Sequence, residues 1–180
     1  MRLFLLTVFV ACASTAVLAD QTDPRLDSLF VELRSGDAFS SEETVGRIID
    51  IWSDAQSDTV DILFERALQS ADEGDLDLAL ALLDHVVGLA PHFAQGFATR
   101  GMMRLTNQDQ SGAVADFSKA LELEPRQFEV RIALAEILLS NHEKRDAYEM
   151  FQKALEWNPH DDHARSRARA LRRELDGQEI

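Results

Sequence analysis

The sequence predicts an all-α protein, a right-handed solenoid in which short pairs of antiparallel helices are stacked in a row. The first observation is a repeat, because Pro91, Pro125 and Pro159 are each separated by 34 residues. Two series of small residues keep the same interval, namely Ala79, Ala113 and Ala147, and Ala67, Gly101 and Ala135. Fixed self-similarity at this period is typical of stacked repeats.

Apolar residues at helical spacing are the second observation. They recur three or four positions apart in segments bounded by turn-forming residues, as in Leu76, Leu80, Leu83, Val86 and Val87. Each proline of the series ends a helix, since proline cannot donate to the backbone hydrogen bonds of the preceding turn. The small residues let the two helices of a pair approach closely. One pair alone cannot bury its apolar faces, so neighbouring pairs must stack.

The middle unit gives the clearest pattern: Phe97, Arg100, Gly101, Arg104, Ala113, Phe117, Ala120 and Pro125. The units on either side share it, with Leu63, Ala67, Ala79, Leu83 and Pro91 before, and Leu134, Ala135, Leu138, Ala147, Phe151, Ala154 and Pro159 after. This pattern resembles the tetratricopeptide repeat. Two departures stand out: Arg100 and Arg104 replace apolar residues, and the first helices lack the family's tryptophan and tyrosine.

The predicted organisation divides the chain into six segments. Three repeat units occupy residues 60–93, 94–127 and 128–161, and a capping helix with an arginine-rich outer face follows at 162–180. In this cap, Trp157 is expected to lie beneath Ala164, Ala168 or Leu171. Residues 20–59 form an N-terminal helical extension, with one helix opening at Pro24 and another capped by Ser40 and Glu43. Two interpretations of this extension remain open, a plain helical extension and a degenerate repeat.

Residues 1–19 have the pattern of a secretory signal peptide. A basic start at Arg2 precedes a charge-free run from Leu3 to Ala19, and small residues stand before Asp20. We expect cleavage after Ala19 and a periplasmic protein. An uncleaved membrane anchor and a lipid-modified Cys12 are the alternatives, and only these two would bring membrane contact. Cleavage would remove Cys12, the single cysteine, and leave no thiol for a disulfide or a metal.

Charge and motif content exclude several classes of function. The formal net charge of -14 opposes binding to nucleic acid or to anionic membrane. His160 and His163 share a helix start with Asp161 and Asp162 but lack further ligands, so we expect a solvated helix cap and no metal site. The sequence contains no phosphate-binding loop, nucleophile elbow or zinc-protease motif. We therefore expect neither a cofactor nor an enzymatic activity.

The resemblance to the tetratricopeptide family implies a concave groove lined by the first helix of each unit. The groove positions expected here are Asp61, Phe64, Leu68, Gln95, Ala98, Met102, Glu129, Ile132 and Glu136. They hold none of the Lys, Asn and Arg residues with which family members clamp a terminal carboxylate. The resemblance thus implies a module that binds an extended or helical segment, basic or apolar, of a partner protein. A self-associating structural protein without a peptide ligand is the alternative, and the oligomeric state is left open.

Overall fold

A computed structural model describes residues 23–177, which form nine helices and no strand. The helices are α1 (Arg25–Ser35), α2 (Ala38–Trp52), α3 (Asp58–Asp72), α4 (Leu76–Leu89), α5 (Ala94–Thr106), α6 (Gln110–Leu123), α7 (Phe128–Ser140), α8 (Lys144–Trp157) and α9 (Asp162–Asp176). Within the described range, no helix has the length and apolar content that crossing a bilayer requires. The predicted all-α fold is confirmed.

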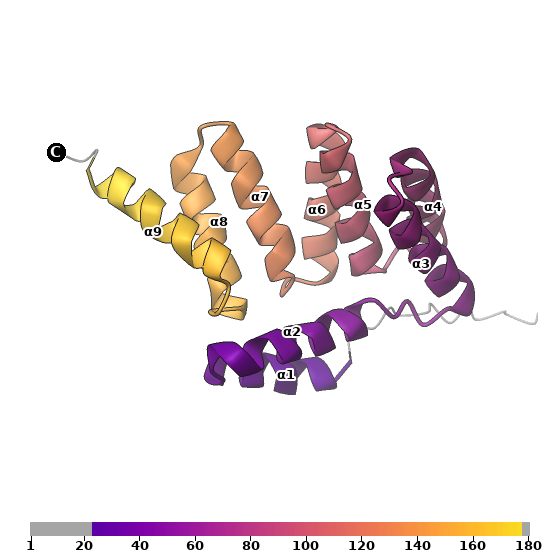
Figure 1. Cartoon of the computed structure of the whole chain (residues 1–180), viewed down its shortest axis with the longest axis horizontal. Helices are drawn as coiled ribbons and strands as arrows, with labels where there is room; N and C mark the ends of the chain where they lie inside the picture. Colours follow the sequence, from indigo (N-terminus) through magenta and orange to yellow (C-terminus); the bar gives the residue numbers. More distant parts are fainter. Residues whose placement is uncertain (1–22, 178–180) are drawn as a thin grey trace, which may run out of the picture.

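Three antiparallel helix pairs, α3–α4, α5–α6 and α7–α8, stand side by side in one row, and α9 closes the row against α8 (Figure 1). The small residues of the 34-residue series lie where two helices of a pair cross. Ala67, Ala79, Ala113, Ala135 and Ala147 are all at most 1% exposed. Close packing at these crossings is what the repeat pattern predicted.

Aspartate side chains cap the helices that follow the turns. Asp75 accepts a hydrogen bond from the backbone N–H of Leu78 at 3.0 Å, and Asp109 accepts one from Gly112 at 2.9 Å. Such a bond satisfies one of the backbone donors that the first turn of a helix leaves free. Asp161 caps α9 in the same way, through Ala164 at 2.7 Å, as the sequence predicted.

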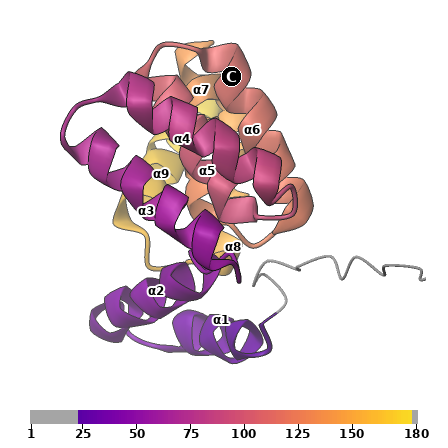
Figure 2. The same cartoon turned by 90° about the vertical axis from the view of Figure 1, so that its right-hand side faces the viewer.

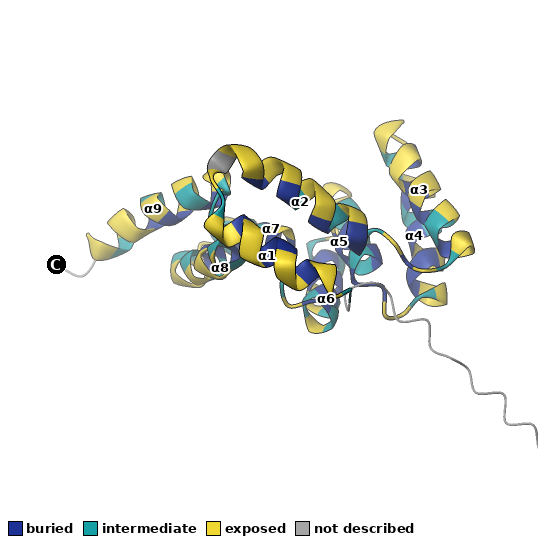
Figure 3. Ribbon diagram, turned by 90° about the horizontal axis from the view of Figure 1, so that it is seen from below, coloured by how far each residue is buried: buried dark blue, intermediate teal, exposed yellow. Residues whose placement is uncertain are grey.

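α1 and α2 form an antiparallel pair, here called the N-terminal hairpin, which is not the next layer of the stack. It lies beneath the other pairs and runs across them, so that α3 forms one end of the row (Figures 1 and 2). Its buried residues join Phe128 of α7 and Ala154 of α8 in one apolar cluster. Seen from below, the outer surface that α1 and α2 turn toward the viewer is largely exposed (Figure 3). The hairpin therefore packs across the stack and does not lengthen the row of helix pairs.

Two sequence predictions about the caps are wrong. Asp37, not Ser40 with Glu43, caps α2, because its carboxylate accepts from the N–H groups of Phe39 and Ser40 at 3.1 and 2.9 Å and starts the helix earlier. Trp157 lies not beneath α9 but against α1, where its ring meets Phe30 edge to face at 5.4 Å.

The face of α9 that was expected to cover Trp157 has other partners. Its residues Ala164, Ala168 and Leu171 pack against Ala147 and Phe151. The 34-residue pattern could not reveal that α1 returns to the far end of the stack, because the repeats define only contacts between neighbouring units.

Candidate functional site

The N-terminal hairpin and residues 53–57, here called the linker, lie over part of the predicted groove. On the first unit, the carboxylate of Asp61 accepts a hydrogen bond from the N–H of Ala55 in the linker at 2.8 Å. Ala55 is 1% exposed and packs in the cluster that contains Phe64. Both groove positions are thus engaged by the chain itself.

Phe64 corrects the predicted site. It is 3% exposed and packs edge to face on Phe93, with ring centroids 5.2 Å apart. Phe64 is therefore a core residue of the first two units and not an exposed anchor. Leu68, one turn further along α3, is 40% exposed and remains accessible to a partner.

The second and third units bring four predicted groove residues together around a hollow of about 50 Å³. The lining consists of Trp52, Gln95, Ala98, Thr99, Met102, Gln127, Glu129 and Val130. Met102 is the apolar side chain that reaches solvent there, at 38% exposure. Gln95 accepts a hydrogen bond from the side-chain amide of Gln127 at 2.9 Å, which joins the starts of α5 and α7.

Glu129 is the acidic member of this lining. Protein atoms crowd its carboxyl although part of the side chain reaches solvent, and this loss of hydration raises its pKa. The negative charge of Asp161 raises the pKa further. A basic group placed beside this carboxyl would oppose both effects, because it would favour the ionised form.

Ile132 and Glu136, the other groove positions of α7, are already in contact with neighbouring elements. Ile132 packs against the cluster of the N-terminal hairpin. Glu136 is bound by α9, through two hydrogen bonds from Arg167 at 2.9 and 2.8 Å and a contact of 2.8 Å with His163 Nε2. The family resemblance placed these two positions in the groove, but in the structure both are half-buried and already in contact with neighbouring elements.

A buried charge cluster fixes the N-terminal hairpin to the loop between α6 and α7. Glu124, whose side chain is 1% exposed, accepts bonds from Arg126 Nη2 at 2.7 Å and from Trp52 Nε1 at 3.3 Å. Arg126 also pairs with Asp27 of α1 at 2.8 Å and lies over the ring of Phe30. Sequence reasoning missed these residues, since they are scattered over about a hundred positions and only the fold brings them together.

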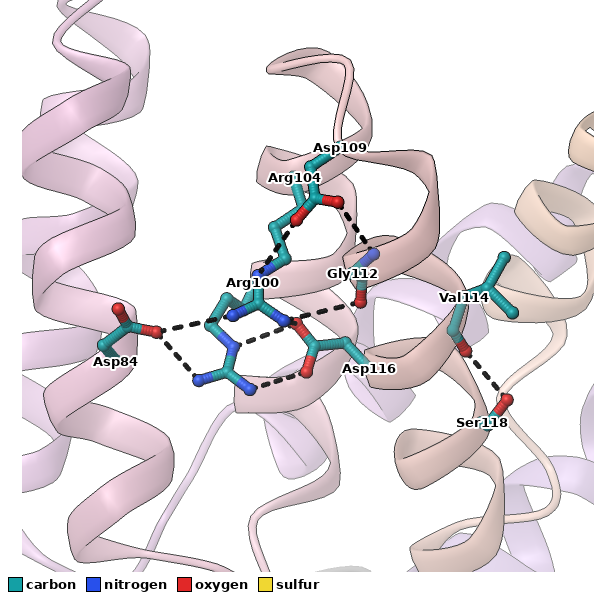
Figure 4. Close-up of polar contacts among 8 residues, drawn as sticks. All are labelled: Asp84, Arg100, Arg104, Asp109, Gly112, Val114, Asp116 and Ser118. Carbon is teal, nitrogen blue, oxygen red and sulfur yellow. Dashed lines mark hydrogen bonds and ion pairs between the residues drawn. The ribbon is translucent and has the colours of Figure 1, made fainter.

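A second cluster explains the two arginines that depart from the family pattern (Figure 4). Arg100 makes a two-pronged contact with Asp116, at 2.9 and 2.6 Å, and Arg104 reaches the same carboxylate at 2.9 Å. Arg100 also bonds to Asp84 of the preceding unit at 2.9 Å. Asp116 is buried, so its charge requires these partners. The arginines therefore tie α4, α5 and α6 together.

Residues 23–177 contain no group of three or more His, Cys, Asp and Glu placed to hold a metal ion. His163 contacts Glu136, while His160 Nε2 is buried and forms no hydrogen bond with any described residue.

Comparison with known proteins agrees with this fold. Residues 105–172 match the family model described as tetratricopeptide repeat. A TPR repeat-containing protein of Rhizobium etli is 26% identical over 154 residues, covering 85% of this chain and 76% of that protein.

Two solved structures show the same architecture. The type III secretion chaperone SycD of Yersinia enterocolitica, in complex with a peptide of the translocator YopD, has a TM-score of 0.61 at 18% identity and covers 66% of this chain and 96% of that one. The first TPR of Spaghetti, bound to an HSP90 peptide, has a TM-score of 0.60 at 15% identity and covers 65% and 93%. With the stacked helix pairs and the 34-residue pattern, these matches show that the chain has the tetratricopeptide-repeat fold, which generally serves as a protein–protein interaction module.

Proposed function

We propose that this chain is a non-enzymatic interaction module that holds an extended or helical segment of a partner protein at the hollow between Trp52, α5 and α7. The observation that carries this proposal is the exposed Met102, which lines the same hollow of about 50 Å³ as Glu129. The two solved structures support it, because each has the same fold as this chain and holds a bound peptide.

The size and chemistry of the hollow define the segment that it would take. About 50 Å³ has room for one small apolar group or for the end of a longer side chain. Apolar contact with Met102 and Leu68 would supply most of the affinity, since a few desolvated side chains dominate an interface. Glu129 would favour a segment with Lys or Arg, because a basic group relieves the unfavourable surroundings of its carboxylate.

The place where this binding occurs is part of the proposal. The predicted signal peptide, residues 1–19, lies outside the described residues, as do Cys12 and the cleavage point after Ala19. We propose that the mature chain acts in the periplasm, and the pattern of a basic start, an apolar run and small residues supports this.

Capture of the natural partner from the native envelope, by crosslinking followed by pull-down, tests the function. Met102→Lys places a charge against the apolar contact and should reduce capture at least tenfold, roughly the loss of one anchor residue. Glu129→Gln should weaken capture mildly and flatten its dependence on salt, because a rim charge chiefly sets orientation and association rate.

Val114→Lys is the matched control, since Val114 is an equally exposed apolar residue of α6, at 36%, that does not line this hollow. Capture that is unchanged by Met102→Lys and lost with Val114→Lys would place the binding surface on the other side of the stack and refute the proposed site.

A further inference from the structure

The two ends of the helix stack carry unlike charges. Residues 58–77, which include α3 and the start of α4, contain seven acidic residues and one basic residue. Helix α9 at the other end contains five arginines and three acids. The two ends lie at opposite sides of the molecule, so they cannot meet within one chain (Figure 1).

Among residues 23–177, no helix covers the acidic end at the positions that are covered in the other units. Val130 and Ala133 of α7 are 3% and 7% exposed, because they pack against Phe117 and Ala120 of the preceding unit. The residues that stand 68 positions earlier are Ile62 and Glu65. Ile62 is 56% exposed, and the exposed residues around it on α3 are Asp58, Glu65, Gln69 and Asp72. We call these five residues the acidic face.

The arginine-rich end likewise has no helix packed on its outer side within the described part of the chain. Arg169 stands 34 residues after Ala135, at the position where a small residue admits the second helix of each pair. Arg172 and Arg173 likewise follow Leu138 and Leu139 by 34 residues. An open hollow of about 830 Å³ runs along this side of α9, lined by Asp162, Arg165, Ser166, Arg169, Arg172 and Arg173. We call the four arginines of this lining the arginine face.

Part of the arginine charge is already compensated inside α9. Arg165 pairs with Asp162, and Arg172 approaches Asp176 at 3.7 Å. Arg169 and Arg173 are exposed, and within residues 23–177 neither one forms an ion pair. Two positive charges on α9 therefore face solvent. They lie on the side of α9 where a further helix would pack if the stack continued.

We propose that the arginine face of one copy docks against the acidic face of a second copy, so that copies of this chain associate head to tail. The contact joins two different surfaces, and each copy keeps one free surface of each kind. Such a contact generates rings or open chains instead of a closed symmetric dimer. The inference does not depend on the proposed groove, because neither surface includes Met102 or Glu129.

Salt dependence is the first measurement. Sedimentation analysis of the mature protein should give a weight-average mass above that of one chain at about 0.01 M salt, and the mass should fall toward that of one chain at about 1 M salt. Over this range the screening length falls from about 30 Å to about 3 Å. A chain that is monomeric at low salt and high protein concentration overturns the proposal.

Charge reversal identifies the surfaces. Arg169→Glu with Arg173→Glu, and separately Glu65→Lys with Asp72→Lys, should each weaken self-association at least about tenfold, because attraction becomes repulsion. An equimolar mixture of the two double variants should associate again, since the negative end of one then meets the positive end of the other. Circular dichroism checks that each variant keeps its helicity.

Lys153→Glu is the control. Lys153 is exposed on α8 and lies outside both faces, and this substitution changes the net charge by the same amount as Arg169→Glu alone. It should leave self-association unchanged. Association that survives both double reversals, or a mixture that stays monomeric, overturns the proposed pairing of faces.

Discussion

At the scale of single residues, the absence of a side chain at Gly101 sets the distance between the helices of the middle pair. A Cβ atom built at Gly101 would lie 2.6 Å from Cε1 of Phe117 and 3.3 Å from the backbone oxygen of Ala113. Contacts below 3.0 Å require something to move, and a fully buried phenylalanine has little room to do so. The family pattern indicated a small residue here. Only the packing explains why this position needs glycine, whereas positions 67 and 135 accept alanine.

Gly101→Ala should therefore destabilise the protein by about 1–3 kcal/mol, the usual cost of adding a methyl group to a full core. Gly88→Ala is the matched substitution, since a Cβ at Gly88 on α4 meets nothing within 4 Å. It should stabilise the protein by about 0.4–1 kcal/mol, because alanine loses less conformational freedom than glycine in a helix. Urea unfolding monitored by circular dichroism measures both, and changes of the same sign would contradict this account of Gly101.

The charged residues show why the roles of Arg100 and Arg104 could not be predicted from the sequence. Arg100 and Arg104 appear in the sequence only as departures from the family pattern. Their partner Asp116 lies 16 positions beyond Arg100, and Asp84 belongs to another unit. No local pattern links these four positions, so their role became visible only when stacking brought α4 beside α5.

At the scale of elements, the N-terminal hairpin is held by one aromatic cluster. The ring centroid of Phe30 lies 5.8 Å from that of Trp52 and 5.4 Å from that of Trp157. The ring centroids of Trp52 and Phe128 are 5.9 Å apart. Both tryptophans of the chain thus report on whether the hairpin is docked. The repeat units have their own clusters, so the hairpin can open as a separate cooperative unit.

Phe30→Ala should weaken this docking by about 3–5 kcal/mol, as loss of a buried phenylalanine usually does. During urea unfolding, the red shift of tryptophan fluorescence should then precede the loss of helicity. Phe151→Ala provides the comparison, because Phe151 is buried among α7, α8 and α9 and contacts neither tryptophan ring. In Phe151→Ala, helicity should be lost at the same urea concentration as the fluorescence changes, or at a lower one. Coincident transitions in Phe30→Ala would show that hairpin and stack unfold as one unit.

At the scale of the whole molecule, the N-terminal hairpin covers one long side of the row of helix pairs, and the outer faces of α3 and α9 at the two ends of the row are exposed. The linker engages groove positions on α3, the hairpin packs against Ile132 of α7, and Leu68 and Met102 stay exposed. The acidic and arginine faces stand at the two ends. A partner segment and a second copy would therefore use different surfaces, and one molecule could engage both.

The export prediction also belongs to this scale. If residues 1–19 are a cleaved signal, N-terminal sequencing of the protein from its native cell should begin at Asp20, and the protein should be released with the periplasmic fraction. A sequence beginning at Met1 together with extraction by detergent only would instead establish the membrane anchor.

The sequence by itself determined the stack. Its 34-residue spacing, its alternation of small and aromatic residues and its prolines specify helix pairs and their order, because each unit contacts only its neighbours and the pattern repeats within each. The tertiary structure alone decided where the N-terminal hairpin lies, which groove positions stay open and which residue covers Trp157. These features depend on contacts between residues about a hundred positions apart, such as Asp27 with Arg126, and on the burial of Glu124 beside Trp52. Long-range contacts of this kind follow from the shape of the folded stack, and a one-dimensional pattern carries no record of them.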